Sequence, residues 1–319
     1  MALAAVPLIA IGMPCAAVAA GMKRLGILAH GGREETLAHH ESTMRKIFAD
    51  LGWIQGKTLE IVWRFGEGDQ LRFPALAREL VAARPDVILT GGTARTRALQ
   101  EATRTIPIHT FVGDPVGSGF AQSLARPGGN ITGLSIGIRE VAQKQIELLR
   151  STLPRLSKLA IVGEITAPTF RENTEPIVSA ASAAGLTPQL AQVSSIAEME
   201  TVLRGLPASG RGAAFLMGNL ERVDEVAAVQ LAIRLRVPAI TGDDDLVEKG
   251  ALFSYSLYHE DPARRATAII DKLLRGADPA MIPFELPNKS RFVINRRTAT
   301  AIGVKFPADF LLRADKVIG

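Results

Sequence analysis

The feature that most constrains the fold is an alternation of short apolar runs with amphipathic helical patterns, which begins at Arg24 and extends through most of the chain. Apolar runs that are bounded by glycine and separated by such helices are typical of parallel strands covered on both faces. We expect strands at residues 24–30, 59–66, 87–91 and 108–113, with helices at 34–51, 69–84 and 93–104. Right-handed crossovers then give a doubly wound layout.

The alternation pauses after residue 113 and resumes near residue 159, where a second set of strands is expected at 159–164, 190–193, 213–219, 239–243 and 251–257. A chain of 319 residues is long enough for two domains. The predicted fold class is therefore α/β, with two doubly wound parallel-sheet lobes joined by a multi-strand hinge.

The hinge fixes the expected domain boundaries. Residues 130–137 read as an extended crossing strand, and the chain has further passages near residues 258 and 283 that suit a return between lobes. We therefore assign residues 23–136 plus about 258–282 to the first lobe, and residues 137–257 plus about 283–319 to the second. Ligands of such folds bind at the carboxyl ends of the strands.

The first 22 residues carry no charged side chain, and an apolar stretch ends at Ala17-Val18-Ala19-Ala20. Small residues at that point fit a signal-peptidase site, so residues 1–20 are predicted to be a cleaved signal peptide that directs the chain to the periplasm. The alternative is a transmembrane anchor, which Pro7 and Pro14 disfavour. Cys15 is the single cysteine, so the mature chain is expected to form neither a disulfide nor a thiolate metal site.

Composition and motifs argue against several function classes. The net charge is +5, and the Lys and Arg residues are scattered along the sequence, whereas nucleic-acid binding needs them concentrated on one face of the protein. The segment 52–58 (GWIQGKT) is one residue short of a phosphate loop and follows a helix, the reverse of the order that loop requires. No histidine has metal-ligand spacing, and no serine lies in a nucleophile-elbow pattern. We therefore expect no catalytic residue, cofactor, metal or nucleic acid.

Candidate ligand-binding residues of the first lobe follow its predicted strands. Gly92, Thr93 and Ala94 end a strand and open a helix, so free backbone N–H groups and the Thr93 hydroxyl suit a carboxylate or another anion, although a simple capped turn is the alternative. Asp114 follows the next strand and is expected either to cap a coming helix or to face the ligand. The first strand ends at His30 and Gly31.

In the second lobe, equivalent positions are occupied by polar and aromatic residues. The candidates are Asn219, Asp243, Asp244 and Tyr255. Acids that open a helix are more often N-caps than metal ligands, which favours a structural role for Asp243 and its neighbour. As ligand residues, Asp243 or Asp244 would receive a cationic or hydroxyl group of the ligand, while Tyr255, Phe111 or Tyr258 would supply an apolar wall.

Several longer stretches carry a resemblance to a known family. These are residues 106–108 (IPI), 113–120 (GDPVGSGF), 123–135 (SLARPGGNITGLS), 253–255 (FSY), 264–266 (RRA), 271–279 (DKLLRGADP) and 292–299 (FVINRRTA). In order and spacing the chain resembles the tryptophan/tyrosine-type ABC-transporter substrate-binding proteins, a branch of the type I periplasmic binding proteins. The resemblance runs from about Lys23 to the C-terminus.

The resemblance implies a monomeric periplasmic protein that closes on a small molecule like a Venus flytrap, delivers it to an ABC permease and uses no cofactor. Relatives that bind aromatic amino acids tend to carry Asp-Asn where this chain has Gly218-Asn219, which weakens the amino-acid assignment. The alternatives are a ligand-sensing receptor or regulator of the same fold and, less favoured, a two-domain α/β enzyme.

Overall fold

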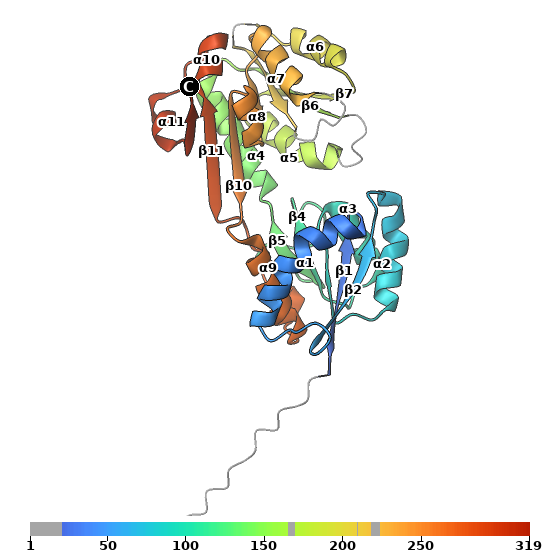
Figure 1. Ribbon diagram of the computed structural model, residues 1–319. Coiled ribbons are helices and arrows are strands. Elements are labelled where there is room, and N and C mark those ends of the chain that lie inside the picture. Colours follow the sequence, from blue (N-terminus) through green and yellow to red (C-terminus); the bar gives the residue numbers. More distant parts are fainter. Residues whose placement is uncertain (1–20, 165–169, 209, 218–223) are drawn as a thin grey trace, which may run out of the picture.

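The computed structural model describes residues 21–164, 170–208, 210–217 and 224–319, which form two α/β lobes joined by a narrow connection (Figure 1). The predicted signal peptide lies outside these residues. Each lobe contains one sheet, and the two sheets have five and seven strands among the described residues. The fold class predicted from the sequence is thereby confirmed. None of the helices in the described ranges combines the length and the apolar character that a membrane span requires.

The first sheet has the strand order β2-β1-β3-β4-β5, and every neighbouring pair is parallel. Its strands are β1 (Lys23–Ala29), β2 (Leu59–Phe65), β3 (Val87–Leu89), β4 (Ile108–Val112) and β5 (Ile131–Ser135). Helices α1 (Arg33–Asp50), α2 (Phe73–Ala82, after a short 3-10 helix at Gln70–Arg72) and α3 (Thr93–Ala102) connect the first four strands. This is the doubly wound layout expected from the alternating pattern.

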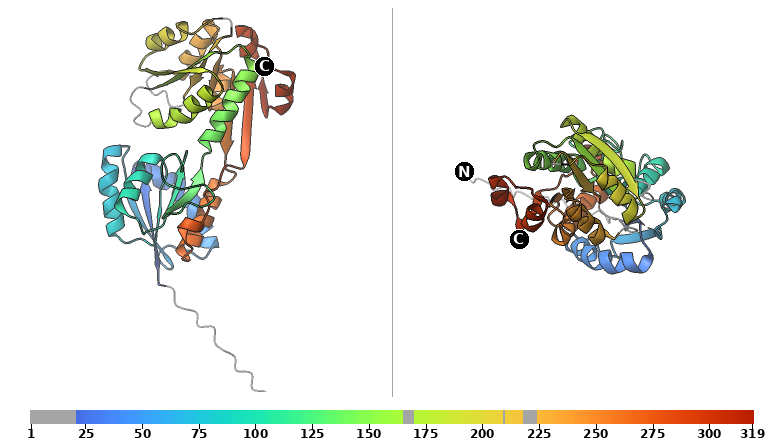
Figure 2. Two further views of the ribbon diagram at one scale, coloured as in Figure 1. Left: turned by 180° about the vertical axis from the view of Figure 1, so that it is seen from behind. Right: turned by 90° about the horizontal axis from the view of Figure 1, so that it is seen from above.

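Apolar side chains on both faces of this sheet bury against the helices. One cluster joins α2 and α3 to the sheet through residues such as Leu80, Leu99 and Ile108. The other cluster joins Phe48 of α1 to the opposite face, together with Ile270 of α9 (Pro262–Leu274). Helix α9 thus packs on the first sheet although it follows most of the second lobe in the sequence (Figure 2).

The second sheet has the order β12-β11-β10-β9-β8-β6-β7. Its strands are β6 (Lys158–Glu164), β7 (Thr187–Val193), β8 (Gly212–Leu216), β9 (Ala239–Thr241), β10 (Phe253–Tyr258), β11 (Lys289–Asn295) and β12 (Lys316–Ile318). Its helices are α4 (Ile138–Thr152), α5 (Phe170–Ala183), α6 (Ile196–Arg204), α7 (Glu225–Arg234), α8 (Asp244–Lys249), α10 (Arg296–Ile302) and α11 (Ala308–Arg313).

One part of this sheet differs from the wholly parallel arrangement expected from the sequence. Strand β11 pairs antiparallel with β10, and β12 then pairs parallel with β11. The reason is the path of the chain, which leaves the second lobe at the end of β10, packs α9 on the first lobe and returns alongside β10. A strand that returns beside the one that left must run in the opposite direction.

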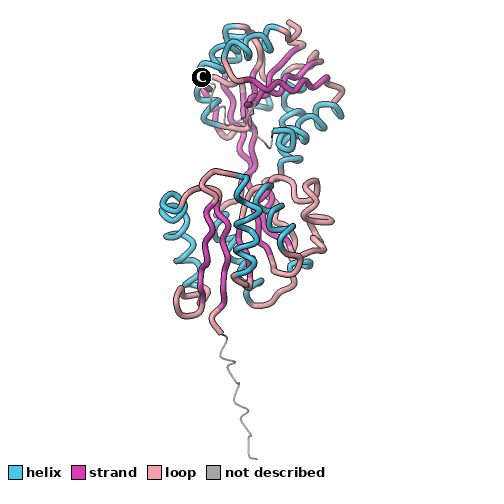
Figure 3. The backbone as a smooth tube through the Cα atoms, turned by 90° about the vertical axis from the view of Figure 1, so that its right-hand side faces the viewer, coloured by secondary structure: helices cyan, strands magenta, loops and turns pink. Residues whose placement is uncertain are grey.

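Three described passages connect the lobes, after β5, after β10 and before β11, and they form the neck seen in Figure 3. Hydrogen bonds join these passages to one another. The N–H of Ser135 donates to the carbonyl of Glu285 at 2.9 Å, and the N–H of Glu285 donates to the carbonyl of Gly133 at 3.0 Å. The ring Nε2 of His259 lies 2.8 Å from the carbonyl oxygen of Ser135. The hinge is therefore a small hydrogen-bonded unit built from separate parts of the sequence.

Candidate functional site

The candidate site begins at the carboxyl ends of β1 and β3, which are neighbours in the first sheet. After β1 the chain passes to the face that α1 covers, and after β3 it passes to the face that α3 covers. Such a reversal is a topological switch point, where open α/β sheets bind their ligands. In Figure 1 this edge of the sheet faces the second lobe.

Three of the predicted residues form the turn that opens α3. Gly92 has φ 78°, a left-handed conformation that suits glycine, and its N–H donates to the carbonyl of Phe111 at 2.8 Å. No side chain caps α3, so the N–H groups of its first turn lack intrahelical acceptors. Thr93 and Ala94 are partly exposed there. The turn therefore presents hydrogen-bond donors at the switch point, although the N–H of Gly92 is already used.

The other two first-lobe candidates from the switch point follow β1. His30 is exposed, and its ring centroid lies 6.1 Å from that of Phe73. The carbonyl oxygen of His30 accepts a hydrogen bond from the N–H of Gly68 at 2.9 Å. Gly31 is partly exposed in the bend that leads to α1. Pairing of β1 with β3 brings this bend next to the turn at Gly92.

Asp114 follows β4, but the helix that it was expected to cap does not form. The chain makes a turn through Pro115, Gly117 and Gly119, where glycines disfavour a helix, and the Asp114 carboxylate accepts the N–H of Gly117 at 2.8 Å. The expectation of a helix cap is therefore wrong, and Asp114 caps a turn.

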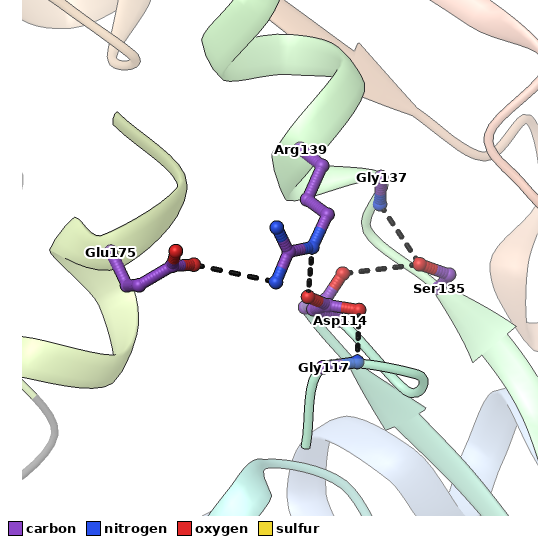
Figure 4. Close-up of polar contacts among 7 residues, drawn as sticks. Asp114, Gly117, Ser135, Gly137, Arg139 and Glu175 are labelled. Carbon is purple, nitrogen blue, oxygen red and sulfur yellow. Dashed lines mark hydrogen bonds and ion pairs between the residues drawn. The ribbon is translucent and has the colours of Figure 1, made fainter. Parts of the chain in front are cut away.

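The second oxygen of Asp114 accepts a hydrogen bond from Nε of Arg139, the second residue of α4 (Figure 4). The same guanidinium lies 3.3 Å from the carboxylate of Glu175 in α5. The hydrogen bond that Arg139 donates to the carboxylate of Asp114 raises the pKa of Arg139. Because Asp114 belongs to the first lobe and α4 and α5 to the second, Arg139 ties the two lobes together beside the hinge.

The two acidic candidates of the second lobe make contacts within that lobe. Asp243 is the N-cap of α8 and accepts the N–H of Asp245 at 2.9 Å. Asp244 accepts the hydroxyl of Ser254 and lies 2.7 Å from Nε of Arg291. The cap agrees with the structural role favoured from the sequence. Whether either carboxylate also contacts ligand stays a prediction.

Tyr255 packs against the core of the second lobe, with its ring 6.4 Å from that of Phe292. Asn219 lies outside the described residues. More of the predicted apolar wall is near the hinge, where the ring of Phe111 is 39% exposed and contacts that of His259 edge-on. Tyr258 at the end of β10 is 47% exposed. The aromatic candidates are therefore divided between a core and the hinge.

Sequence reasoning missed two arginines at this site. Arg139 is one, and its signal was weak because its two partners, Asp114 and Glu175, come from two other segments of the chain. Arg95 is the other: it lies in the first turn of α3, and the carbon Cζ of its guanidinium lies 5.7 Å from the centre of the Phe73 ring. A cation at a helix N-terminus opposes the helix dipole, and that mismatch was a signal available in the sequence.

A cavity of about 500 Å³ lies between α4 and α5 in the second lobe, and Arg139 is one of its lining residues. Its lining includes Gln143, Arg150 and Ser179, which belong to the helices and not to strand ends. Among the residues that the structure describes, no group of three or more His, Cys, Asp or Glu side chains could hold a metal ion.

Comparison with known proteins extends over nearly the whole chain. The family described as "ABC transporter substrate binding protein" matches residues 27–318. A tyrosine-binding protein of Clostridioides difficile (strain R20291) is 23% identical over 266 residues, which cover 83% of this chain and 76% of that protein.

Solved structures share the fold. An ABC domain from Streptococcus pneumonia in complex with L-Trp has a TM-score of 0.69 at 22% identity, covering 93% of this chain and 100% of its own. A ligand-free, open substrate-binding protein with adhesive properties from Clostridium difficile has a TM-score of 0.67 at 19% identity, covering 93% and 99%. Because the family match spans both lobes and the hinge, this chain belongs to the ABC transporter substrate-binding protein family.

Proposed function

We propose that this protein binds a small carboxylate-bearing molecule between its lobes, outside the cytoplasm, and delivers it to the permease of an ABC importer. The observation that carries the proposal is the uncapped start of α3 at Thr93, which lies at the switch point on the edge of the first sheet that faces the second lobe. Family membership supports the transport role. Residues 1–20 serve as the export signal in this proposal.

The relatives indicate which carboxylates to test first. One curated relative is a tyrosine-binding protein, and one solved structure holds L-Trp. An aromatic amino acid is therefore the first candidate. Other small carboxylates come next, because this chain has Gly218 at the position where relatives that bind aromatic amino acids tend to carry an acid, which would pair with an α-ammonium group. The exposed ring of Phe111 would contribute to an apolar wall.

Calorimetric titration of the Thr93→Ala variant tests the proposed site. A hydrogen bond to a charged group contributes about 1.5–3 kcal/mol, so loss of the Thr93 hydroxyl should weaken carboxylate binding roughly ten- to hundredfold. Thr93→Ser keeps the hydroxyl and should bind within a few-fold of the wild type. A wild-type protein that binds nothing in a panel of amino acids, other carboxylates and sugars would refute the proposed function. Equal affinities of the Ala and Ser variants would remove Thr93 from the site.

A further inference from the structure

Arg95 lies over the turn that follows β3. A Cβ atom built on Gly92 would be 3.4 Å from its Nη2, and one built on Gly91 would be 3.8 Å from the same nitrogen. Phe73, the first residue of α2, stacks against the guanidinium. The side chain of Arg95 is partly exposed and its Nε is buried, while its Nη2 lies beside the exposed Gly92.

The guanidinium of Arg95 has no counterion among the described residues. Its buried Nε has no hydrogen-bond partner there, and the ion pairs of the described chain do not include Arg95. Two acids that follow other strands of the first sheet are engaged elsewhere: Asp69 accepts the N–H of Leu71 at 2.9 Å, and Asp114 pairs with Arg139. Burial accordingly lowers the pKa of Arg95 to about 10.

The position of Arg95 in the first turn of α3 is also electrostatically unfavourable. The N-terminus of a helix carries partial positive charge, so a cation in the first turn is unfavourable there. The buried Nε of Arg95, which has no hydrogen-bond partner among the described residues, is a second unfavourable feature. Stacking on Phe73 offsets part of this, but it supplies no acceptor for the N–H donors of the guanidinium, and the described residues supply none either. An anion in front of the turn would satisfy both the helix end and the guanidinium.

We propose that Arg95 is the counterion for the carboxylate of the bound ligand, and that it sets the specificity of the site for anionic over uncharged molecules. The inference rests on the proposed function and deepens it. A planar guanidinium matches a carboxylate with two parallel hydrogen bonds. An uncharged ligand would leave the cation unpaired when the lobes close over it, and a site with buried, unpaired polar groups rejects such ligands.

The test compares acids with their amides. Calorimetry would measure L-tyrosine against L-tyrosinamide, L-tryptophan against L-tryptophanamide, and succinate against succinamide, in the wild type, Arg95→Gln and Arg95→Lys. We expect the wild type to prefer the acid of the pair that it binds. Arg95→Gln should lose about ten- to hundredfold in affinity for that acid, and Arg95→Lys should lose less.

Arg97→Gln is the matched control, because it removes the same charge from the same helix. The guanidinium of Arg97 is already satisfied by the carbonyl of Ser118 at 3.0 Å and by the Phe120 ring at 5.1 Å. Its affinity for the acid should stay near that of the wild type. Thermal unfolding without ligand gives an independent readout: Arg95→Gln should melt at the same temperature as the wild type or higher, because an unpaired charge is removed.

Three outcomes would overturn the inference. A lower melting temperature of Arg95→Gln with unchanged affinity would show that the residue only stacks on Phe73. An equal loss of affinity in Arg97→Gln would show a long-range effect of charge. If the wild type binds uncharged sugars or amides in preference to acids, Arg95 is not a counterion, but the proposal of solute binding still stands. If the wild type binds none of the compounds, the proposed function is rejected as well.

Discussion

His109 lies within β4 with its side chain almost fully buried, and neither ring nitrogen has a hydrogen-bond partner among the described residues. Burial lowers its pKa to about 4 from an ordinary value near 6.5. As the pH falls through 6.5, His109 therefore becomes protonated in the unfolded chain, whereas in the folded state it stays neutral until about pH 4. Stability should fall over that window.

Between pH 7 and pH 5, His109 alone should reduce the free energy of unfolding by about 2 kcal/mol. Urea unfolding of His109→Leu at both pH values should show a correspondingly smaller difference than the wild type. His30→Leu, which removes an exposed histidine of the same lobe, is the control and should keep the wild-type difference. Parallel pH profiles for His109→Leu and the wild type would contradict the assignment.

At the scale of elements, β5 is held between β4 and the returning chain at Glu285. Gly133 lies opposite Thr110 in the β4–β5 pairing, with φ 148°, and its carbonyl accepts the N–H of Glu285. A Cβ atom at Gly133 would overlap the carbonyl oxygen of Thr110 and lie 2.7 Å from its nitrogen. Only glycine therefore allows β5 to approach β4 at this point.

Gly133→Ala should accordingly lower the free energy of unfolding by at least about 3 kcal/mol, from backbone strain and overpacking together. Gly129→Ala is the matched control, because nothing lies within 4 Å of a Cβ atom there. That variant should stay within about 0.5 kcal/mol of the wild type. The measurement is the urea midpoint, or the yield of folded protein if Gly133→Ala does not accumulate. Equal midpoints for the two variants would refute the argument.

At the scale of the whole molecule, Arg139 links the lobes through Asp114 and Glu175 (Figure 4). The pair is partly exposed, with 45% of the Arg139 side chain accessible, so its contribution is about 0.2–1 kcal/mol. An interaction of that size biases the relative arrangement of the lobes without locking it, and a ligand can shift the balance through its differential affinity.

In the absence of ligand, we expect Arg139→Gln to lower the ratio of linked to unlinked lobe arrangements by up to about fivefold. Pulsed EPR between spin labels at Glu101 and Thr201, one exposed site on each lobe, would report a broader distance distribution. Lys144→Gln breaks a pair within α4 alone and should leave the distribution unchanged. A change of the same size in both variants would remove Arg139 as the link between lobes.

The sequence by itself determined the strand and helix alternation, the first sheet, the strands β6 to β10 of the second sheet and the turn at Gly92 and Thr93, because these depend on local periodicity and on which residues follow a strand. It did not predict the antiparallel β11, whose direction depends on how the chain returns through the hinge. Only the tertiary structure decided that Asp114 pairs with Arg139, because its partners lie on different elements. The same reason applies to Arg95, which has no counterion among the described residues: ion pairing is a property of packing, which no local pattern encodes.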